Sequence, residues 1–270
     1  MSSVILIFIF IFGLIIGSFL NCLVWRLYKN ETVLGRSYCP KCREKIFWYD
    51  NIPVISFLLL HGKCRHCQEK ISVQYPLVEL AVGFLFSLAY LKIFVGSGGL
   101  VLSSDQLIIN GQPALLLLQA WLAIAVMAAV LIYDARWYLI STNLIIGAAV
   151  LFLGLDIFLG VNWINLFWSL FIGIGFFLLQ YLLTRGRGLG EGDIWLGGLL
   201  AIIFPQPNLL LTALFISYLI GGVTGLVLLL GQKRGLKSKL PLGIFLAFGA
   251  ILTIFFGSEL LGWYLGLLRG

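Results

Sequence analysis

The chain has 270 residues, of which 61% are hydrophobic and only 11% are charged, and its mean hydropathy is +1.05. A soluble domain usually carries about 25% charged residues, so this composition excludes an ordinary soluble protein and indicates one that crosses a membrane several times. The net charge of +7 does not indicate nucleic-acid binding here, because basic residues beside membrane spans orient those spans. We expect the lipid bilayer as a partner and no nucleic acid.

Runs of about 20 apolar residues predict eight membrane-spanning helices, of which the sixth is short. The first run has no basic segment before it and no small-residue cleavage site, so we interpret it as a retained span and not as a signal peptide. We place the spans near residues 4–24, 77–95, 114–133, 143–160, 165–184, 193–205, 209–231 and 242–267. The predicted fold class is therefore an all-α polytopic membrane protein of about eight transmembrane helices. Its predicted domains are the first helix (1–24), a loop (25–76) and a helical membrane domain (77–270).

The basic residues are distributed asymmetrically between these spans. Sixteen of the eighteen lie in the segments that follow spans one, three, five and seven, and nine of them lie within 25–76. Because cytoplasmic segments are enriched in Lys and Arg, we expect this side to be cytoplasmic and both termini to lie outside. The same alternation predicts that residues 25–76, Asp134 and Asp193 share one cytoplasmic face.

Four cysteines in the loop form two C-x-x-C pairs, Cys39 with Cys42 and Cys64 with Cys67, separated by 21 residues. Four thiolates at this spacing suit tetrahedral zinc, in the manner of a zinc ribbon. A similar polar turn follows each pair, which indicates a small internal near-repeat with two ligands in each half. Such a site has no open coordination position, so the zinc is expected to organise the loop and not to catalyse hydrolysis.

The same cysteines have a plainer interpretation, a redox dithiol or a loop without metal. Two pairs make this weaker than a single C-x-x-C would, and a cytoplasmic loop keeps thiols reduced and available to a metal. Cys22 stands apart in the first span, where a buried apolar thiol is the simpler interpretation.

Two aspartates occupy comparable positions at the ends of apolar runs. Asp134 ends the third predicted span, and Asp193 opens the sixth within Gly190-Glu191-Gly192-Asp193. A charged carboxylate within a membrane helix costs about 2.5–3.5 kcal/mol on insertion scales, so such residues are usually functional. Two carboxylates brought together can share a proton and divide acid and base roles. Gly190 and Gly192 permit positive φ and close backbone approach, so this loop can bring Asp193 beside another helix.

Each aspartate also has an ordinary alternative. Asp134 can be an interfacial residue paired with Arg136, and Asp193 can be an N-cap at the start of a helix. A proton-coupled transporter would likewise use two membrane carboxylates. These alternatives stay open on the aspartates alone.

Several motifs in chain order resemble the type IV prepilin peptidases, the prepilin leader peptidase/N-methyltransferase family of GxGD membrane aspartic proteases. The resemblance covers nearly the whole chain. Its motifs are Gly17-Ser18-Phe19-Leu20-Asn21 with Arg26, the cysteine loop with Asp50-Asn51-Ile52-Pro53, Tyr75-Pro76-Leu77-Val78-Glu79, Gly190-Glu191-Gly192-Asp193 and Leu240-Pro241-Leu242-Gly243. The sequence departs from the family pattern at Ser141, Trp195 and Ile244, where proline, lysine and proline are common.

The resemblance implies that Asp134 and Asp193 cleave the basic leader from prepilins or pseudopilins at the cytoplasmic face of the bacterial inner membrane. Because the cysteine loop resembles that of bifunctional members, it also implies N-methylation of the new terminus with S-adenosylmethionine as methyl donor. Glu79, Asn21 and Arg26 are candidate cofactor-binding residues only because they match family motifs. The alternative within membrane proteases is a presenilin-like or signal-peptide-peptidase-like enzyme, which gives no reason for the zinc loop.

Overall fold

The computed structural model describes residues 2–96, 100–103, 106–109, 111–186, 189–231 and 241–269. The chain forms two compact units, residues 1–129 and residues 130–270, and the division falls within helix α4 (Gly111–Trp137). Helices dominate both units, which confirms the predicted fold class.

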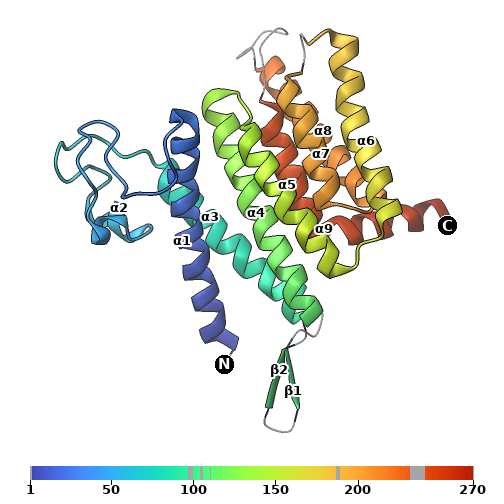
Figure 1. Ribbon diagram of the computed structural model, residues 1–270, viewed down its shortest axis with the longest axis horizontal. Coiled ribbons are helices and arrows are strands. Elements are labelled where there is room, and N and C mark those ends of the chain that lie inside the picture. The colour runs from blue at the N-terminus through green and yellow to red at the C-terminus, as the bar shows by residue number, and fades with distance from the viewer. Residues whose placement is uncertain are drawn as a thin grey trace. The chain divides into compact units, whose positions relative to one another are not determined.

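The first unit is built on two closely crossing helices, α1 (Ser2–Lys29) and α3 (Gln74–Ala89), and π-helical turn η2 (Tyr90–Val95) extends α3 (Figure 1). Gly13 and Gly17 lie one helical turn apart on the face of α1 that meets α3. A Cβ atom on Gly17 would lie 2.7 Å from the Cα atom of Glu79, a distance that no real side chain adopts. Small residues spaced in this way let membrane helices approach backbone to backbone. The glycine pair therefore sets the crossing of α1 and α3.

The segment between α1 and α3 contains the 3₁₀ turn η1 (Trp48–Asn51) and the short helix α2 (Ile55–Leu59). After η2 the chain forms an antiparallel hairpin of β1 (Leu100–Ser103) and β2 (Gln106–Ile109), in which Leu100 pairs with Ile109. The sequence analysis did not predict this hairpin.

The second unit contains α5 (Thr142–Leu159), α6 (Trp163–Thr184), α7 (Glu191–Ile203), α8 (Pro207–Leu230) and α9 (Leu242–Arg269). A helix therefore lies at each of the eight predicted spans. Seven helices in the part of the chain that the structure describes are long and apolar enough to cross a membrane. The exception is α7, whose 13 residues reach only about 20 Å, less than the roughly 30 Å of a hydrocarbon core.

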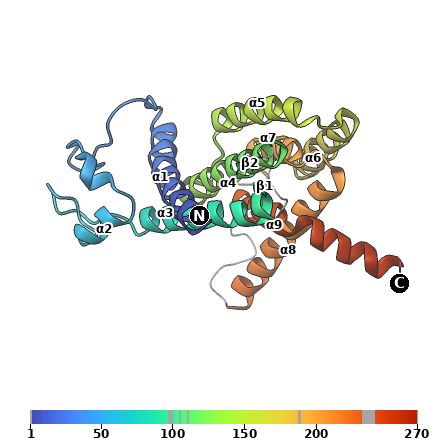
Figure 2. The same cartoon turned by 90° about the horizontal axis from the view of Figure 1, so that it is seen from below.

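Helix α7 lies within the second unit and contacts α5, α6, α8 and α9 (Figure 2). Nine of its residues are buried, including the whole run Leu196–Ile203. Proline at position 205 disfavours continuation of the helix beyond Phe204, and the hydroxyl of Ser169 on α6 donates to the Pro205 carbonyl at 3.0 Å. Protein therefore surrounds most of this short helix, and its first turn carries Asp193.

Candidate functional site

Asp134 lies near the carboxyl end of α4, with 4% of its surface exposed. Its Oδ2 atom accepts a hydrogen bond of 3.1 Å from the backbone N–H of Ile244, 110 residues further along the chain. Ile244 belongs to the first turn of α9, where backbone N–H groups lack partners within the helix and the helix dipole is positive. The start of α9 therefore holds the Asp134 carboxylate, and the sequence analysis did not assign it this function.

The close approach of α9 to Asp134 depends on Gly243. A Cβ atom at this position would lie 2.8 Å from Oδ2 and 3.2 Å from Cγ of Asp134, so any larger residue would displace either the helix or the carboxylate. The available signal in the sequence was a glycine two residues after Pro241, at the point where an apolar run begins.

Asp193 is the third residue of α7, and 8% of its surface is exposed. Its Oδ2 atom accepts a hydrogen bond of 3.0 Å from the N–H of Gly190, and its own N–H donates to the Gly190 carbonyl at 3.1 Å. This reciprocal pairing is the backbone form of a capping box, which fixes the carboxylate over the start of its own helix. Both candidate carboxylates are thus held at helix amino termini, Asp134 by α9 and Asp193 by α7.

The two glycines before Asp193 have different functions in the structure. A Cβ atom on Gly192 would lie 2.8 Å from Cβ of Ile140, which follows Asp134 by six residues, whereas a Cβ atom on Gly190 would find its nearest neighbour at 3.8 Å. Neither glycine uses positive φ, since Gly190 has φ −84° and Gly192 lies within α7. Only Gly192 is needed for close approach, and it lets the start of α7 pack against the segment that follows Asp134.

The two carboxylates therefore belong to one compact unit, and both are more than nine-tenths buried. Two carboxyl groups that are brought together in a poorly solvated place can share one proton. This arrangement suits acid–base chemistry on a water molecule.

The second cluster consists of Cys39, Cys42, Cys64 and Cys67, whose sulfur atoms all lie within 4.8 Å of one another. The Sγ atoms of Cys39 and Cys67 are 3.8 Å apart. Four sulfurs placed tetrahedrally at about 2.3 Å from a zinc ion would be about 3.8 Å apart, so the cluster can hold this metal.

The two halves of this cluster have the same backbone structure, which confirms the internal near-repeat. In the first, the Cys39 N–H donates to the Glu44 carbonyl at 2.9 Å; in the second, the Cys64 N–H donates to the Glu69 carbonyl at 2.9 Å. Arg43 and Gln68, the residues that follow each C-x-x-C pair, both adopt positive φ, 61° and 58°. The repeated turn therefore directs two sulfur atoms from each half toward one common centre.

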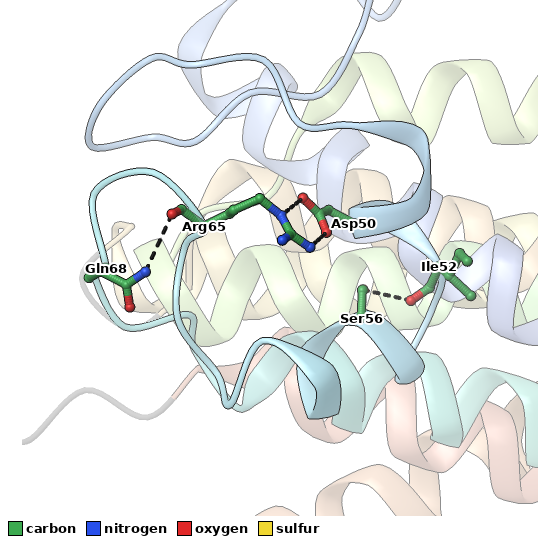
Figure 3. Close-up of polar contacts among 5 residues, drawn as sticks. All are labelled: Asp50, Ile52, Ser56, Arg65 and Gln68. Atoms are coloured by element: carbon green, nitrogen blue, oxygen red, sulfur yellow. Dashed lines mark hydrogen bonds and ion pairs between the residues drawn. The ribbon is translucent and has the colours of Figure 1, made fainter.

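An ion pair fastens the second half of the cluster to η1 (Figure 3). The guanidinium of Arg65 donates from Nε and Nη2 to the two carboxylate oxygens of Asp50, at 2.7 and 2.6 Å. These hydrogen bonds lower the pKa of Asp50 below its ordinary value. The ion pair therefore contributes to the stability of the folded loop at neutral pH, and this contribution is lost as the pH falls through the lowered pKa of Asp50.

The three candidate cofactor residues are all buried in the first unit, but only two are neighbours. Asn21 donates through Nδ2 to the carbonyls of Gly17 and Tyr75, at 3.2 and 3.3 Å, and Gly17 packs against Glu79. Arg26 instead donates to backbone carbonyls of the turn that follows α1, those of residues 32, 33, 35 and 36. These contacts make Arg26 an organiser of that turn.

Family models and several known proteins match this chain. The bacterial peptidase A24 N-terminal domain matches residues 11–93, and the type IV leader peptidase family matches residues 121–226. An Escherichia coli protein described as a type 4 prepilin-like proteins leader peptide-processing enzyme is 32% identical over 90% of this chain and 91% of its own length. The chain belongs to the type IV leader peptidase family.

Other members of the leader peptidase family match to different extents. A prepilin leader peptidase/N-methyltransferase of Vibrio cholerae is 52% identical, but over only 30% of this chain and 36% of that protein. One of Bacillus subtilis is 29% identical over 97% of this chain and 98% of its own length. No solved structure matches significantly. Family membership and the seven candidate spans identify a multi-pass inner-membrane protein.

Proposed function

We propose that this protein cleaves the leader peptide of type IV prepilins or pseudopilins at the cytoplasmic face of the membrane, with Asp134 and Asp193 as the catalytic dyad. The observation that carries the proposal is the pair of buried carboxylates, each held at a helix amino terminus in the same unit. Family relatives named as prepilin leader peptidases support the substrate class.

In this mechanism the dyad shares one proton and binds one water molecule. The ionised carboxylate takes a proton from the water, whose oxygen attacks the scissile carbonyl. The protonated carboxyl group then donates its proton to the leaving amine. The dyad titrates as a unit, so the base and acid roles are properties of the pair.

Co-expression with a prepilin that carries a basic leader tests the proposal directly. We expect a faster-migrating pilin whose new amino terminus lies just after a glycine at the start of the hydrophobic segment. Cleavage within the hydrophobic segment would instead indicate a presenilin-like protease. Carboxylate-dependent uptake of a solute without any cleavage would indicate a transporter.

The four cysteines are proposed to hold one structural zinc ion, which closes the loop and supplies no catalytic step. We expect about one zinc per chain in purified protein, and much less in Cys39→Ser or Cys64→Ser, because a structural site needs all four thiolates. Atomic absorption measures the content. Cys22→Ser is the matched control and should retain the metal; equal zinc in all three variants would contradict the assignment.

A second activity, methylation of the newly exposed amino terminus with S-adenosylmethionine, is proposed from the cysteine-bearing loop and from the names of the relatives. Mass spectrometry of processed pilin checks it. We expect an increase of one methyl group, about 14 Da, only when the methyl donor is supplied. An unmethylated terminus with and without the donor would refute this activity and leave the peptidase unaffected.

We also propose the orientation that the positive charges predict when the short helix α7 counts as a crossing, with both termini outside and the loop 25–76 and both aspartates on the cytoplasmic side. Asn21, Glu79 and Arg26 remain the candidates for contact with the methyl donor.

A further inference from the structure

The loop between α1 and α3 exposes large apolar side chains that a segment in water would normally cover. On η1 and α2, Trp48, Ile55, Leu58 and Leu59 are 76%, 55%, 66% and 73% exposed. The short helix α2 has no buried residue at all. An exposed apolar patch of this kind marks a surface that contacts another molecule or a membrane.

The position of α2 along the membrane helices indicates that the patch contacts the membrane. The N–H of Val54, the residue before α2, donates to the Glu79 carboxylate at 2.7 Å, and the backbone of Glu79 packs against Gly17. Gly17 lies within the apolar part of α1, about 10 Å before the end of that apolar run at Val24, at 1.5 Å per residue. Figure 1 shows α2 at a level between the two ends of α1 and not beyond its carboxyl end, and Figure 2 shows α2 beside the start of α3.

A strained turn holds the segment at this level. Val54 has φ 62° and ψ −50°, and Ile55 donates to the Pro53 carbonyl at 2.6 Å across it, which is the geometry of a γ-turn. A β-branched residue in such a conformation is strained and persists only where its surroundings impose it. The turn directs the Val54 N–H to the buried Glu79, so this contact anchors α2 beside α3.

Part of the backbone between residues 52 and 63 is hydrogen-bonded within that stretch, as a segment in lipid requires. Besides Val54, whose N–H pairs with Glu79, seven donors pair with carbonyls of residues 52–60. These donors are the N–H groups of Ile55, Ser56, Leu58, Leu60, His61, Gly62 and Lys63. The Ser56 hydroxyl likewise donates to the Ile52 carbonyl at 2.6 Å (Figure 3).

We propose that the exposed apolar side chains of residues 47–60 insert into the lipid leaflet in which α1 ends, and that the occupant of this apolar surface is lipid. The Val54–Glu79 contact places the start of α2 at the level of Gly17, within the apolar part of α1. Residues 25–76 also contain nine basic and four acidic residues, a charge that suits anionic headgroups around an inserted apolar element. The loop that holds the metal cluster is thus partly a membrane structure and not a free extramembrane domain.

Photo-crosslinking in membranes tests this directly. A diazirine-bearing amino acid replaces Leu59 in the full chain, in vesicles of phosphatidylcholine and phosphatidylglycerol, and adducts are identified by mass spectrometry. We expect lipid adducts at Leu59 and at least about ten times fewer at Arg43, an exposed charged position in the first half of the cluster. Lipid adducts no more frequent at Leu59 than at Arg43, or adducts to a second protein copy or to prepilin instead of lipid, would overturn the proposal.

Tryptophan fluorescence gives a second readout that leaves α2 intact. Subtracting the emission of Trp48→Phe from that of the unchanged protein gives the emission of Trp48 alone. This difference emission is measured in vesicles with and without bromine on the lipid acyl chains. We expect bromine to reduce this difference emission by at least half. Unquenched emission with the spectrum of tryptophan in water would contradict insertion, and zinc content equal to that of the unchanged protein verifies that the loop of Trp48→Phe is folded.

Discussion

Asp134→Asn and Asp193→Asn are each expected to lower the rate of prepilin cleavage by at least about 10³-fold while the protein remains in the membrane. Asparagine keeps the shape of the side chain but cannot exchange the proton that the dyad must transfer, and a positioned acid or base contributes about 10²–10⁴-fold. Purified enzyme in detergent or vesicles, with a full-length prepilin and a gel-shift readout over time, measures the loss. Because the two carboxylates act as one unit, the double variant should lose little more than either single variant.

Glu191→Gln is the matched control for these changes, since Glu191 is an exposed carboxylate two residues before Asp193. It should retain cleavage within about threefold, because an exposed side chain outside the dyad loses only a screened charge interaction. Substantial activity in either aspartate variant would exclude the dyad mechanism. Equal losses in all three variants would show that negative charge at the loop, and not proton transfer, is what matters.

Gly243→Ala is expected to lower kcat by about 10²-fold, although it adds a single methyl group far from both aspartates in sequence. Its Cβ atom would lie 2.8 Å from Oδ2 of Asp134, so the start of α9 and the carboxylate cannot both keep their positions. A displacement of about 1 Å in a catalytic group is enough for a loss of this size. Gly192→Ala should act similarly on Asp193, because its Cβ atom would collide with Ile140.

Gly190→Ala separates this steric argument from a general need for flexible glycines. The position has φ −84°, and an added Cβ atom would meet nothing closer than 3.8 Å, so we expect activity within about threefold of the unchanged enzyme. Thermal unfolding of all three variants in detergent distinguishes misplacement from misfolding. If Gly190→Ala were as damaging as Gly192→Ala, the loop would depend on backbone freedom and the packing explanation would be wrong.

Much of the architecture could be predicted from the sequence because its signals are local. A run of apolar residues must form a helix in a membrane, since every backbone group has to be satisfied within the segment, and all eight predicted helices are present. The two C-x-x-C pairs predicted the cluster of four cysteines in the same way, because the spacing within each turn is a property of a few adjacent residues. The hairpin at 100–109 was missed because each of its strands has only four residues, and so short a run does not identify a strand by its periodicity.

The sequence by itself therefore determined the class of protein, the eight helices, the two halves of the cysteine cluster and the two aspartates worth testing. Only the tertiary structure decided that the start of α9 holds Asp134, that Gly192 is needed for packing while Gly190 is not, and that α2 lies at the level of the membrane helices. The physical reason is that these interactions join residues far apart in the sequence. The Asp134–Ile244 hydrogen bond joins residues 110 apart, and the lack of room for a Cβ atom at Gly192 or Gly243 depends on how helices cross. No local sequence pattern encodes these crossings.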